Sequence, residues 1–106
     1  MIRVGGENLA PVQVEQAMRD VLGVQQVCVV GMPDQRLGEV PAAVVVCGPD
    51  LDWPAGLAQL RTQLAGFKMP RSIYVADALP TTAATQRVQR AVLKDWIAEG
   101  RLRRVA

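Results

Sequence analysis

Apolar residues recur at helical spacing after Pro11. Five of them fall on one face: Val14, Ala17, Met18, Val21 and Leu22. This i, i+3, i+4, i+7, i+8 pattern predicts an amphipathic helix. Proline suits the first position of a helix, because the N–H group that it lacks has no helical partner there. Gly23 follows the last apolar position and predicts the end of the helix.

Two valine-rich runs, "VQQVCVVGMPD" and "EVPAAVVVCG", predict buried strands. The link "MPDQRLG" is short, so we expect these two strands to pair antiparallel. Pro41 lies near the start of the second run, where a missing N–H group is tolerated. A third strand is predicted in "SIYVADAL", because Ile73 and Val75 alternate with polar or small neighbours.

Two further helices complete the pattern. The first opens at Pro54 and has three leucines on one face: Leu57, Leu60 and Leu64. The last ends at Gly100 and is marked by five apolar residues: Val88, Val92, Leu93, Trp96 and Ile97. The Gly5-Gly6 pair near the start predicts a tight hairpin. We therefore predict one α+β domain, a small sheet of about three strands plus an N-terminal β-hairpin, covered by three helices.

The composition is that of a globular domain, with 106 residues, of which 50% are apolar and 21% charged. The net charge of +2 is too small to indicate a nucleic-acid or membrane-surface partner. No stretch approaches the ~18 apolar residues of a membrane-spanning helix, and none resembles a signal peptide. We expect a soluble, cytoplasmic protein with no membrane span.

Three arginines cluster near the end of the chain, in "EGRLRRVA": Arg101, Arg103 and Arg104. Cations are favourable near a helix C-terminus, and we expect them to belong to a frayed tail. Binding to nucleic acid would need a broader basic face interleaved with aromatic residues. The chain holds only two Trp, one Tyr and one Phe, which argues against that role.

Cys28 and Cys47 lie inside the valine-rich runs and are expected to be buried small hydrophobes. The chain has no histidine and no other cysteine. It therefore lacks the usual ligands of a zinc site, a Cys/His nucleophile pair and the commonest general base. We expect no metal site here and no complete catalytic cycle by this chain alone.

Two stretches are candidates for function. The first, Gly5-Gly6-Glu7-Asn8, is either a plain hairpin turn or a backbone along which a narrow ligand passes. It lacks the Gly-Lys-Ser/Thr of a Walker loop and the spacing of a dinucleotide fingerprint.

The second candidate is the hydroxyl-rich loop over residues 79–90, with Arg87 as its cation. In one interpretation its threonines, Thr81, Thr82 and Thr85, cap the last helix and Arg87 is a solvated charge in the first turn. A cation there opposes the helix dipole, which indicates a role beyond stability. The residues alone leave both interpretations open.

Three stretches resemble, in order and spacing, the C-terminal domain of the adenylate-forming acyl- and aryl-CoA ligases. They are "VGGENLAPVQVEQAM", "VCVVGMPDQRLGEVPAAVVV" and "LAGFKMPRSIYVADALPTTAATQRVQRAVL", within residues 2–97. The resemblance implies a two-step reaction. A carboxylic acid and ATP give an acyl-adenylate and pyrophosphate, and the thiol of coenzyme A then displaces AMP. Mg²⁺ is expected with the ATP of the complete enzyme, and no cofactor is expected on this domain alone.

In this family most of the active site lies on a larger N-terminal domain, and the C-terminal domain is a lid that rotates between the two steps. The resemblance thus implies that residues 1–106 are the lid, that the N-terminal domain lies outside them, and that it acts in cis or in trans. Gly5 and Gly6 match the loop that lines the pantetheine tunnel, where the absence of a side chain is the requirement. Glu7, Asn8 and Pro11 match the same motif.

The loop over residues 79–90 matches the segment of the family's adenylation lysine, written P-x-T-x-x-G-K-[IV]-Q-R. Aligning Val88 with the [IV] position puts Arg87 at the lysine and leaves one extra residue near Ala83-Ala84. Aligning Pro80 with the motif's proline puts Gln86 there instead. Neither alignment has a lysine.

Three functions remain open at this point. The first is the lid of an acid-CoA ligase, acting on fatty or aryl acids. The second is the lid of an adenylation domain that loads a carrier-protein thiol. The third is a non-catalytic binding module derived from the same fold, which the missing lysine favours and the intact glycine loop opposes.

Overall fold

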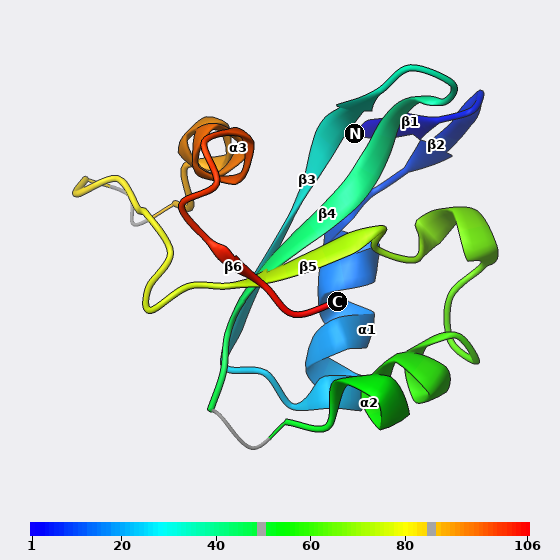
Figure 1. Cartoon of the computed structure of the whole chain (residues 1–106), viewed down its shortest axis with the longest axis horizontal. Coiled ribbons are helices and arrows are strands. Elements are labelled where there is room, and N and C mark those ends of the chain that lie inside the picture. The colour runs from blue at the N-terminus through cyan, green and yellow to red at the C-terminus, as the bar shows by residue number, and fades with distance from the viewer. Residues whose placement is uncertain (49–50, 85–86) are drawn as a thin grey trace.

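The computed structural model describes residues 1–48, 51–84 and 87–106 (Figure 1). The elements in chain order are β1 (Ile2–Val4), β2 (Glu7–Leu9), α1 (Pro11–Leu22), β3 (Gln26–Asp34), β4 (Gly38–Val46), α2 (Trp53–Leu60), a 3-10 turn (Gly66–Lys68), β5 (Ser72–Val75), α3 (Arg90–Ala98) and β6 (Arg103–Arg104). The predicted α+β class is confirmed.

The described strands form one mixed sheet built around β4. Strand β3 pairs with β4 antiparallel over its whole length, with Gly31 opposite Pro41, as the short link predicts. On the other side of β4, β1 pairs antiparallel at Val4–Gly38 and β5 pairs parallel over residues 42–45. The parallel pair requires a crossover connection, and α2 lies within it. The N-terminal hairpin is therefore an extension of the main sheet.

The sheet separates two apolar cores, because side chains alternate between the faces of a strand. Val27 and Val29 of β3 face one core together with residues of α1 and with Leu60 of α2. Cys28 and Val30 face the other core, with Leu93 of α3. Figure 1 accordingly shows α1 and α2 on one side of the sheet and α3 on the other.

Helix α1 confirms the predicted face and both predicted ends. Val14, Met18 and Leu22 are buried, while Ala17 and Val21 pack against the same core. Gly23 has a left-handed φ of 65°, and its N–H donates to the carbonyl of Arg19 at 3.0 Å. The sequence pattern gave no sign that Glu15, beside this face, is also buried.

Two helix boundaries differ from the prediction. Helix α2 is capped by Asp52, whose carboxylate accepts from the N–H of Ala55, and it ends at Leu60, so Leu64 is a core residue beyond it. Helix α3 begins at Arg90, because Val88 instead forms an antiparallel bridge with Thr81.

The expectation of a frayed arginine tail was wrong. Arg103 and Arg104 form β6, which pairs antiparallel with Val75 and Tyr74 of β5. The pairing continues beyond β6, since the N–H of Val105 donates to the carbonyl of Ile73 at 2.8 Å. Val105 also packs against the first core, which ties down this part of the chain.

No helix in the described part of the chain is long and apolar enough to cross a membrane.

Candidate functional site

The turn between β1 and β2 consists of Gly5 and Gly6, with positive φ of 55° and 89°. This is the conformation of a tight hairpin turn with two left-handed residues, which strongly favours glycine. The N–H of Gly5 donates to the carbonyl of Leu37 at 2.9 Å. A Cβ atom on Gly5 would lie 3.0 Å from Cδ2 of Leu37, so the backbone approaches this side chain closely. We call Gly5 and Gly6 the glycine turn.

The surface at Gly6 is unobstructed. A Cβ atom there would have no heavy atom within 4 Å, apart from its chain neighbours. Glu7 and Asn8 follow as exposed residues of β2, opposite Val4 and Arg3 of β1. Leu9 is fully buried and anchors the hairpin to the core. The glycine turn can therefore present bare backbone at the surface from a fixed position.

The link between β3 and β4 supports the glycine turn. One carboxylate oxygen of Asp34 accepts from the N–H groups of Arg36 and Leu37, at 2.9 and 2.8 Å. These bonds, that to Leu37 first, lower the pKa of Asp34 below its usual value of 3.8. They fix the position of Leu37, whose carbonyl holds Gly5.

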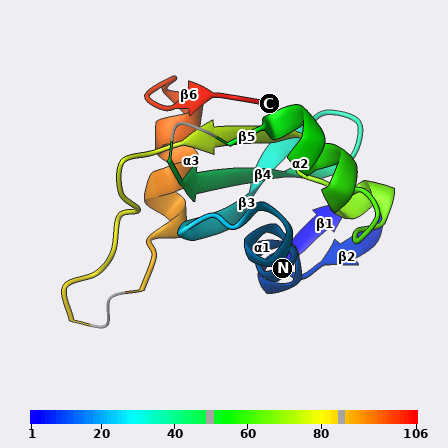
Figure 2. The ribbon, with the colours of Figure 1, turned by 90° about the horizontal axis from the view of Figure 1, so that it is seen from below.

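The loop that carries Arg87 has two extended legs, residues 80–82 and 87–89. The N–H of Thr82 donates to the carbonyl of Arg87 at 2.9 Å, and the N–H of Gln89 donates to that of Pro80 at 2.8 Å. The bridge between Thr81 and Val88 lies between these bonds. Figures 1 and 2 show this pair of legs, which we call the arginine arm, extending away from the sheet beside α3.

Arg87 is exposed and lies in the arm, three residues before α3, so the predicted position in the first turn of that helix was wrong. The predicted caps also differ. The N-cap residue is Gln89, with no side-chain bond, and the hydroxyl of Thr82 instead accepts from the N–H of Arg87 at 3.4 Å. Thr85 and Gln86, the alternative residue at the lysine position, lie outside the described residues.

An ion pair between a buried carboxylate and a half-exposed arginine, which sequence reasoning missed, holds the end of the arm. Glu15 is 5% exposed, and its Oε2 accepts from Nη2 of Arg90 at 2.8 Å and from the N–H of Val29 at 2.8 Å. Nε of Arg90 also donates to the carbonyl of Val29 at 3.4 Å. The only sequence signal was a charge beside the apolar face of a predicted helix and an arginine at the start of another.

The two cysteines do not form a reactive centre. Both are free thiols, Cys28 buried and Cys47 half-buried. Burial raises the pKa of Cys28 to about 11, so its thiol is protonated at neutral pH and is a poor nucleophile. Among the residues that the structure describes, no group of three or more His, Cys, Asp or Glu side chains could hold a metal ion.

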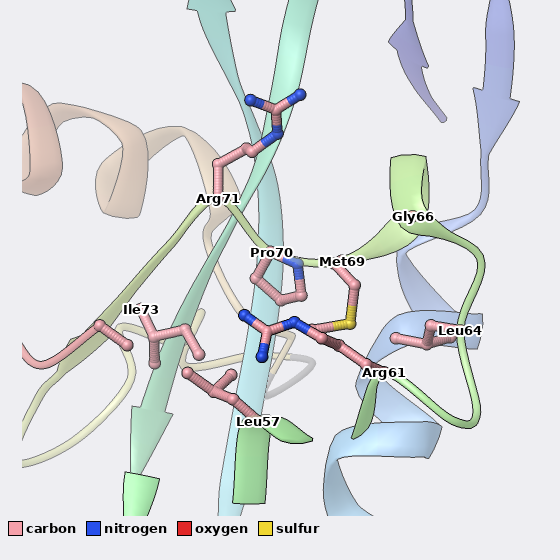
Figure 3. Close-up of a pocket in the computed structure, with 9 residues that line it drawn as sticks. Leu57, Arg61, Leu64, Gly66, Met69, Pro70, Arg71 and Ile73 are labelled. Carbon is pink, nitrogen blue, oxygen red and sulfur yellow. The ribbon is translucent and has the colours of Figure 1, made fainter. Parts of the chain in front are cut away.

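A pocket of about 560 Å³ lies between α2, the 3-10 turn and β5 (Figure 3). Its lining is mainly apolar, with Leu57, Met69 and Ile73 among the residues. In Figure 3 the side chain of Arg61 lies across these residues, whereas that of Arg71 points away from them. None of the sequence-predicted site residues lines this pocket, and we assign it no role.

The glycine turn and the arginine arm are on opposite sides of the domain. The views in Figures 1 and 2 agree on this, with β1 and β2 at one end of the sheet and the arm beside α3 at the other. The structure therefore does not bring Gly5, Gly6 and Glu7 together with Arg87 in one site. It carries two separate candidate sites at opposite ends of one domain.

Comparison with known proteins identifies the kind of domain. The family model described as "AMP-binding enzyme C-terminal domain" matches residues 13–85. A feruloyl-CoA synthase of Amycolatopsis sp. is 48% identical over 86 residues, which is 79% of this chain and 18% of the relative. A 2-succinylbenzoate–CoA ligase of Listeria monocytogenes is 37% identical over 95 residues, covering 90% of this chain and 20% of the relative.

Solved structures of CoA synthetases share the fold of this chain. A fatty acyl CoA synthetase of Mycobacterium tuberculosis superposes with a TM-score of 0.84 at 33% identity, covering 94% of this chain and 20% of that one. The o-succinylbenzoate CoA synthetase of Bacillus subtilis, in complex with its acyl-adenylate intermediate, superposes with a TM-score of 0.81 at 32% identity. The match covers 89% of this chain and 19% of that one. The chain thus spans about a fifth of the length of these proteins.

Proposed function

The chain belongs to the AMP-binding enzyme C-terminal domain family, and we propose that it works as the mobile lid of an acid-CoA ligase. In this proposal a separate adenylating domain supplies most of the active site, in cis or in trans. That domain joins a carboxylic acid to ATP, with Mg²⁺ accompanying the nucleotide. Coenzyme A then takes the acyl group from the adenylate as a thioester. The isolated chain performs neither step.

The observation that carries the proposal is the placement of the two candidate sites at opposite ends of one domain. One catalytic centre cannot contact both sides of a rigid domain at the same time. A domain that rotates between two half-reactions can present the arm in the first and the glycine turn in the second. The lid role thus gives each feature a separate step.

The glycine turn fits the thioester-forming step. The pantetheine arm of coenzyme A is narrow and needs a passage past the lid to reach the adenylate. The left-handed backbone of Gly5 and Gly6, with nothing within 4 Å of a Cβ at Gly6, leaves space for such a passage. Because the turn is bonded to Leu37, its backbone keeps its position when the ligand passes.

Arg87 fits the adenylating step, although its cation is a guanidinium where the family has the ammonium group of a lysine. A positive charge near the acid carboxylate and the α-phosphate stabilises the negative charge that develops as pyrophosphate leaves. A guanidinium keeps this charge, but it is planar, and it is larger and more weakly hydrated than an ammonium group. The extra residue near Ala83-Ala84 also changes where the loop delivers it. We propose that Arg87 supports adenylation slowly.

A non-catalytic module is the second candidate, favoured by the absence of lysine from residues 79–90. In that case the glycine turn would keep its shape, and the arm would have no part in adenylation. The two candidates therefore differ in one measurable property, the rate of acyl-adenylate formation in the presence of an adenylating domain.

The test is a chimera in which this chain replaces the C-terminal segment of the Amycolatopsis feruloyl-CoA synthase. Acid-dependent pyrophosphate release reports the first half-reaction, and thioester formation from supplied acyl-adenylate reports the second. We expect both above the level of the N-terminal domain alone, with the native enzyme as the upper reference. No gain in either half-reaction contradicts the lid role. Thioester formation with a pantetheinylated carrier protein but not with coenzyme A favours the carrier-loading type.

A further inference from the structure

We propose that Glu15 is a positioning residue for the adenylating step, acting through Arg90 to hold the arginine arm in place. The proposal rests on the lid function proposed above. It adds a residue on α1 that lies outside both candidate sites, and it gives Arg90 a task distinct from that of Arg87.

A single oxygen of Glu15 joins three elements of the domain. Oε2 accepts from the N–H of Val29 on β3 and from Nη2 of Arg90 on α3, both at 2.8 Å. The side chain of Glu15 is only 7% exposed, so water competes little for its oxygens, whereas the side chain of Arg90 is 45% exposed. Buried carboxylates are costly unless they are paired and bonded, and here both conditions are met. The pair therefore has a defined geometry.

Arg90 is held by more than its charge. Nε donates to the carbonyl of Val29 while Nη2 reaches Glu15, so the planar guanidinium is fixed at two points. Arg90 is also the first residue of α3 and directly follows the second leg of the arm. Fixing its side chain against β3 fixes where that leg leaves the body of the domain. Arg87 lies three residues away along the same leg.

Two backbone bonds of the described part of the arm connect its legs to each other. They run between Thr82 and Arg87 and between Gln89 and Pro80. Val88 and Leu79 pack against the second core, but apolar contacts are non-directional and permit small shifts. The ion pair of Glu15 and Arg90 is the directional link from the described arm to α1 and β3.

Charge gives a second reason for this arrangement. A surface groove is lined by Glu15 together with three arginines, Arg19, Arg87 and Arg90. Without the carboxylate, like charges at Arg87 and Arg90 would repel each other and shift the arm. With it, the charge of Arg90 is compensated, and Arg87 is left free of an ion pair. Neither Arg19 nor Arg87 forms a salt bridge within the described residues.

The expected consequence is a selective loss of adenylation. A misplacement of about 1 Å at a reacting group can cost on the order of 100-fold in rate. The glycine turn lies at the opposite end of the domain and has its own backbone bonds, so it does not depend on Glu15. A purely structural role for Glu15 would instead weaken both half-reactions together.

The first experiment uses the chimera with the feruloyl-CoA synthase N-terminal domain and the variants Glu15→Ala and Glu15→Gln. Glu15→Ala removes both bonds, whereas Glu15→Gln keeps a neutral oxygen that accepts from Val29 and Arg90. We expect adenylation to fall by about 10-fold or more in Glu15→Ala and less in Glu15→Gln, with thioester formation from supplied adenylate within about 2-fold. The matched control is Glu99→Gln, which breaks the exposed ion pair with Arg101 and leaves both rates unchanged.

The second experiment needs no enzyme activity. Amide hydrogen exchange of the 106-residue chain reports the arm through the N–H groups of Thr82 and Gln89. In Glu15→Ala we expect these two amides to exchange about 10-fold faster, while the amides of β4 keep their protection. A uniform rise across the sheet, or no change in the arm, overturns the proposal.

The two experiments separate the two proposals. If the unmutated chimera performs neither half-reaction, the lid function fails, and the exchange measurement alone decides whether Glu15 holds the arm. If the chimera adenylates and Glu15→Ala adenylates equally fast, the lid function stands and the positioning role fails. Equal losses in both half-reactions also overturn the positioning role.

Discussion

The glycine turn and the arginine arm differ in how they are held. The turn is part of the sheet, and its position follows from backbone bonds to β2 and to Leu37. The arm extends from the domain on two legs and is tied to the body by apolar contacts and by the ion pair of Glu15 and Arg90. One feature contributes bare backbone, and the other delivers a side chain.

This difference determines what each feature tolerates. The turn needs only the left-handed conformation and empty space, and glycine supplies both whatever lies elsewhere in the sequence. In the proposed function the arm must bring a suitable cation to the reacting groups, so we expect it to be sensitive to loop length, to the identity of residue 87 and to the contact with Glu15 on α1. We therefore expect the arm to limit the activity of this lid.

The largest expected effect is the absence of ATP turnover when the chain is assayed without an adenylating domain. In the proposed function both features act in steps that need an adenylating domain, and the described part of the chain has no ligand set for a metal ion. We expect the purified chain to fold but to release no pyrophosphate from ATP in the presence of carboxylic acids. Pyrophosphate release that depends on the added acid would contradict this prediction.

The second prediction concerns the arm. In the chimera, Arg87→Lys combined with deletion of Ala84 restores the family's cation and loop length. We expect adenylation to rise by up to about 100-fold, because reach and orientation at a reacting group can account for this much. Thioester formation from supplied adenylate should not change.

The single changes are the controls for that prediction. Arg87→Lys alone corrects the cation, and deletion of Ala84 alone corrects the length, so their separate rates show which one limits the step. If the native chain already adenylates as fast as the double variant, Arg87 is a competent substitute for lysine and the arm does not limit this lid.

The third prediction concerns the glycine turn. Gly6→Leu should slow thioester formation by about 10-fold and leave adenylation nearly unchanged, which corresponds to about 1.4 kcal/mol in the barrier. The matched control is Gly6→Ala, since both variants carry the same unfavourable left-handed backbone at φ 89° but alanine adds little bulk. The difference between the two variants isolates the blocked passage. If alanine is as harmful as leucine, the backbone conformation is responsible and not the passage.

The sequence predicted the turn better than the arm for a physical reason. The Gly5-Gly6 pair is a local signal, since two adjacent left-handed residues need glycine wherever they occur. The apolar face of α1 and the valine runs of β3 and β4 are equally local, because each reflects the repeat of one element against one core. These parts of the fold were correctly predicted from periodicity.

The parts that could not be predicted depend on contacts between distant residues. Glu15 and Arg90 are 75 positions apart, and nothing near either residue indicates the other. Val88 fits the apolar period of a helix, yet its bridge with Thr81 delays the start of α3 to Arg90. The two arginines of β6 show no apolar alternation and join the sheet through backbone bonds to β5. Tertiary pairing overrode the local pattern at each of these places.

The smallest expected effect is on the support of the glycine turn. Asp34 is only half-buried and acts through two backbone N–H groups, so Asp34→Asn should lower stability less than any core truncation, such as Leu9→Ala. The folded-state pKa of Asp34 lies below 3.8, its usual value, because its ionised form is bonded to Leu37 and Arg36. Its contribution is therefore fully present above about pH 4 and is lost as the pH falls through the lower, folded-state pKa.

Urea unfolding of the chain and of Asp34→Asn at a series of pH values checks this sign. We expect the chain to be more stable than the variant at pH 7 and the difference to shrink as the pH falls below about 4, where the unfolded carboxyl begins to take up a proton. The matched control is Asp20→Asn, because Asp20 is an exposed carboxylate on α1 that, within the described residues, accepts from the side chain of Gln16 alone. Since Asp34 supports Leu37 and Leu37 holds Gly5, thioester formation in the chimera should decline slightly in Asp34→Asn, and adenylation should not. A difference in stability that persists unchanged into acid would mean that the ionised carboxylate of Asp34 is not what holds the turn.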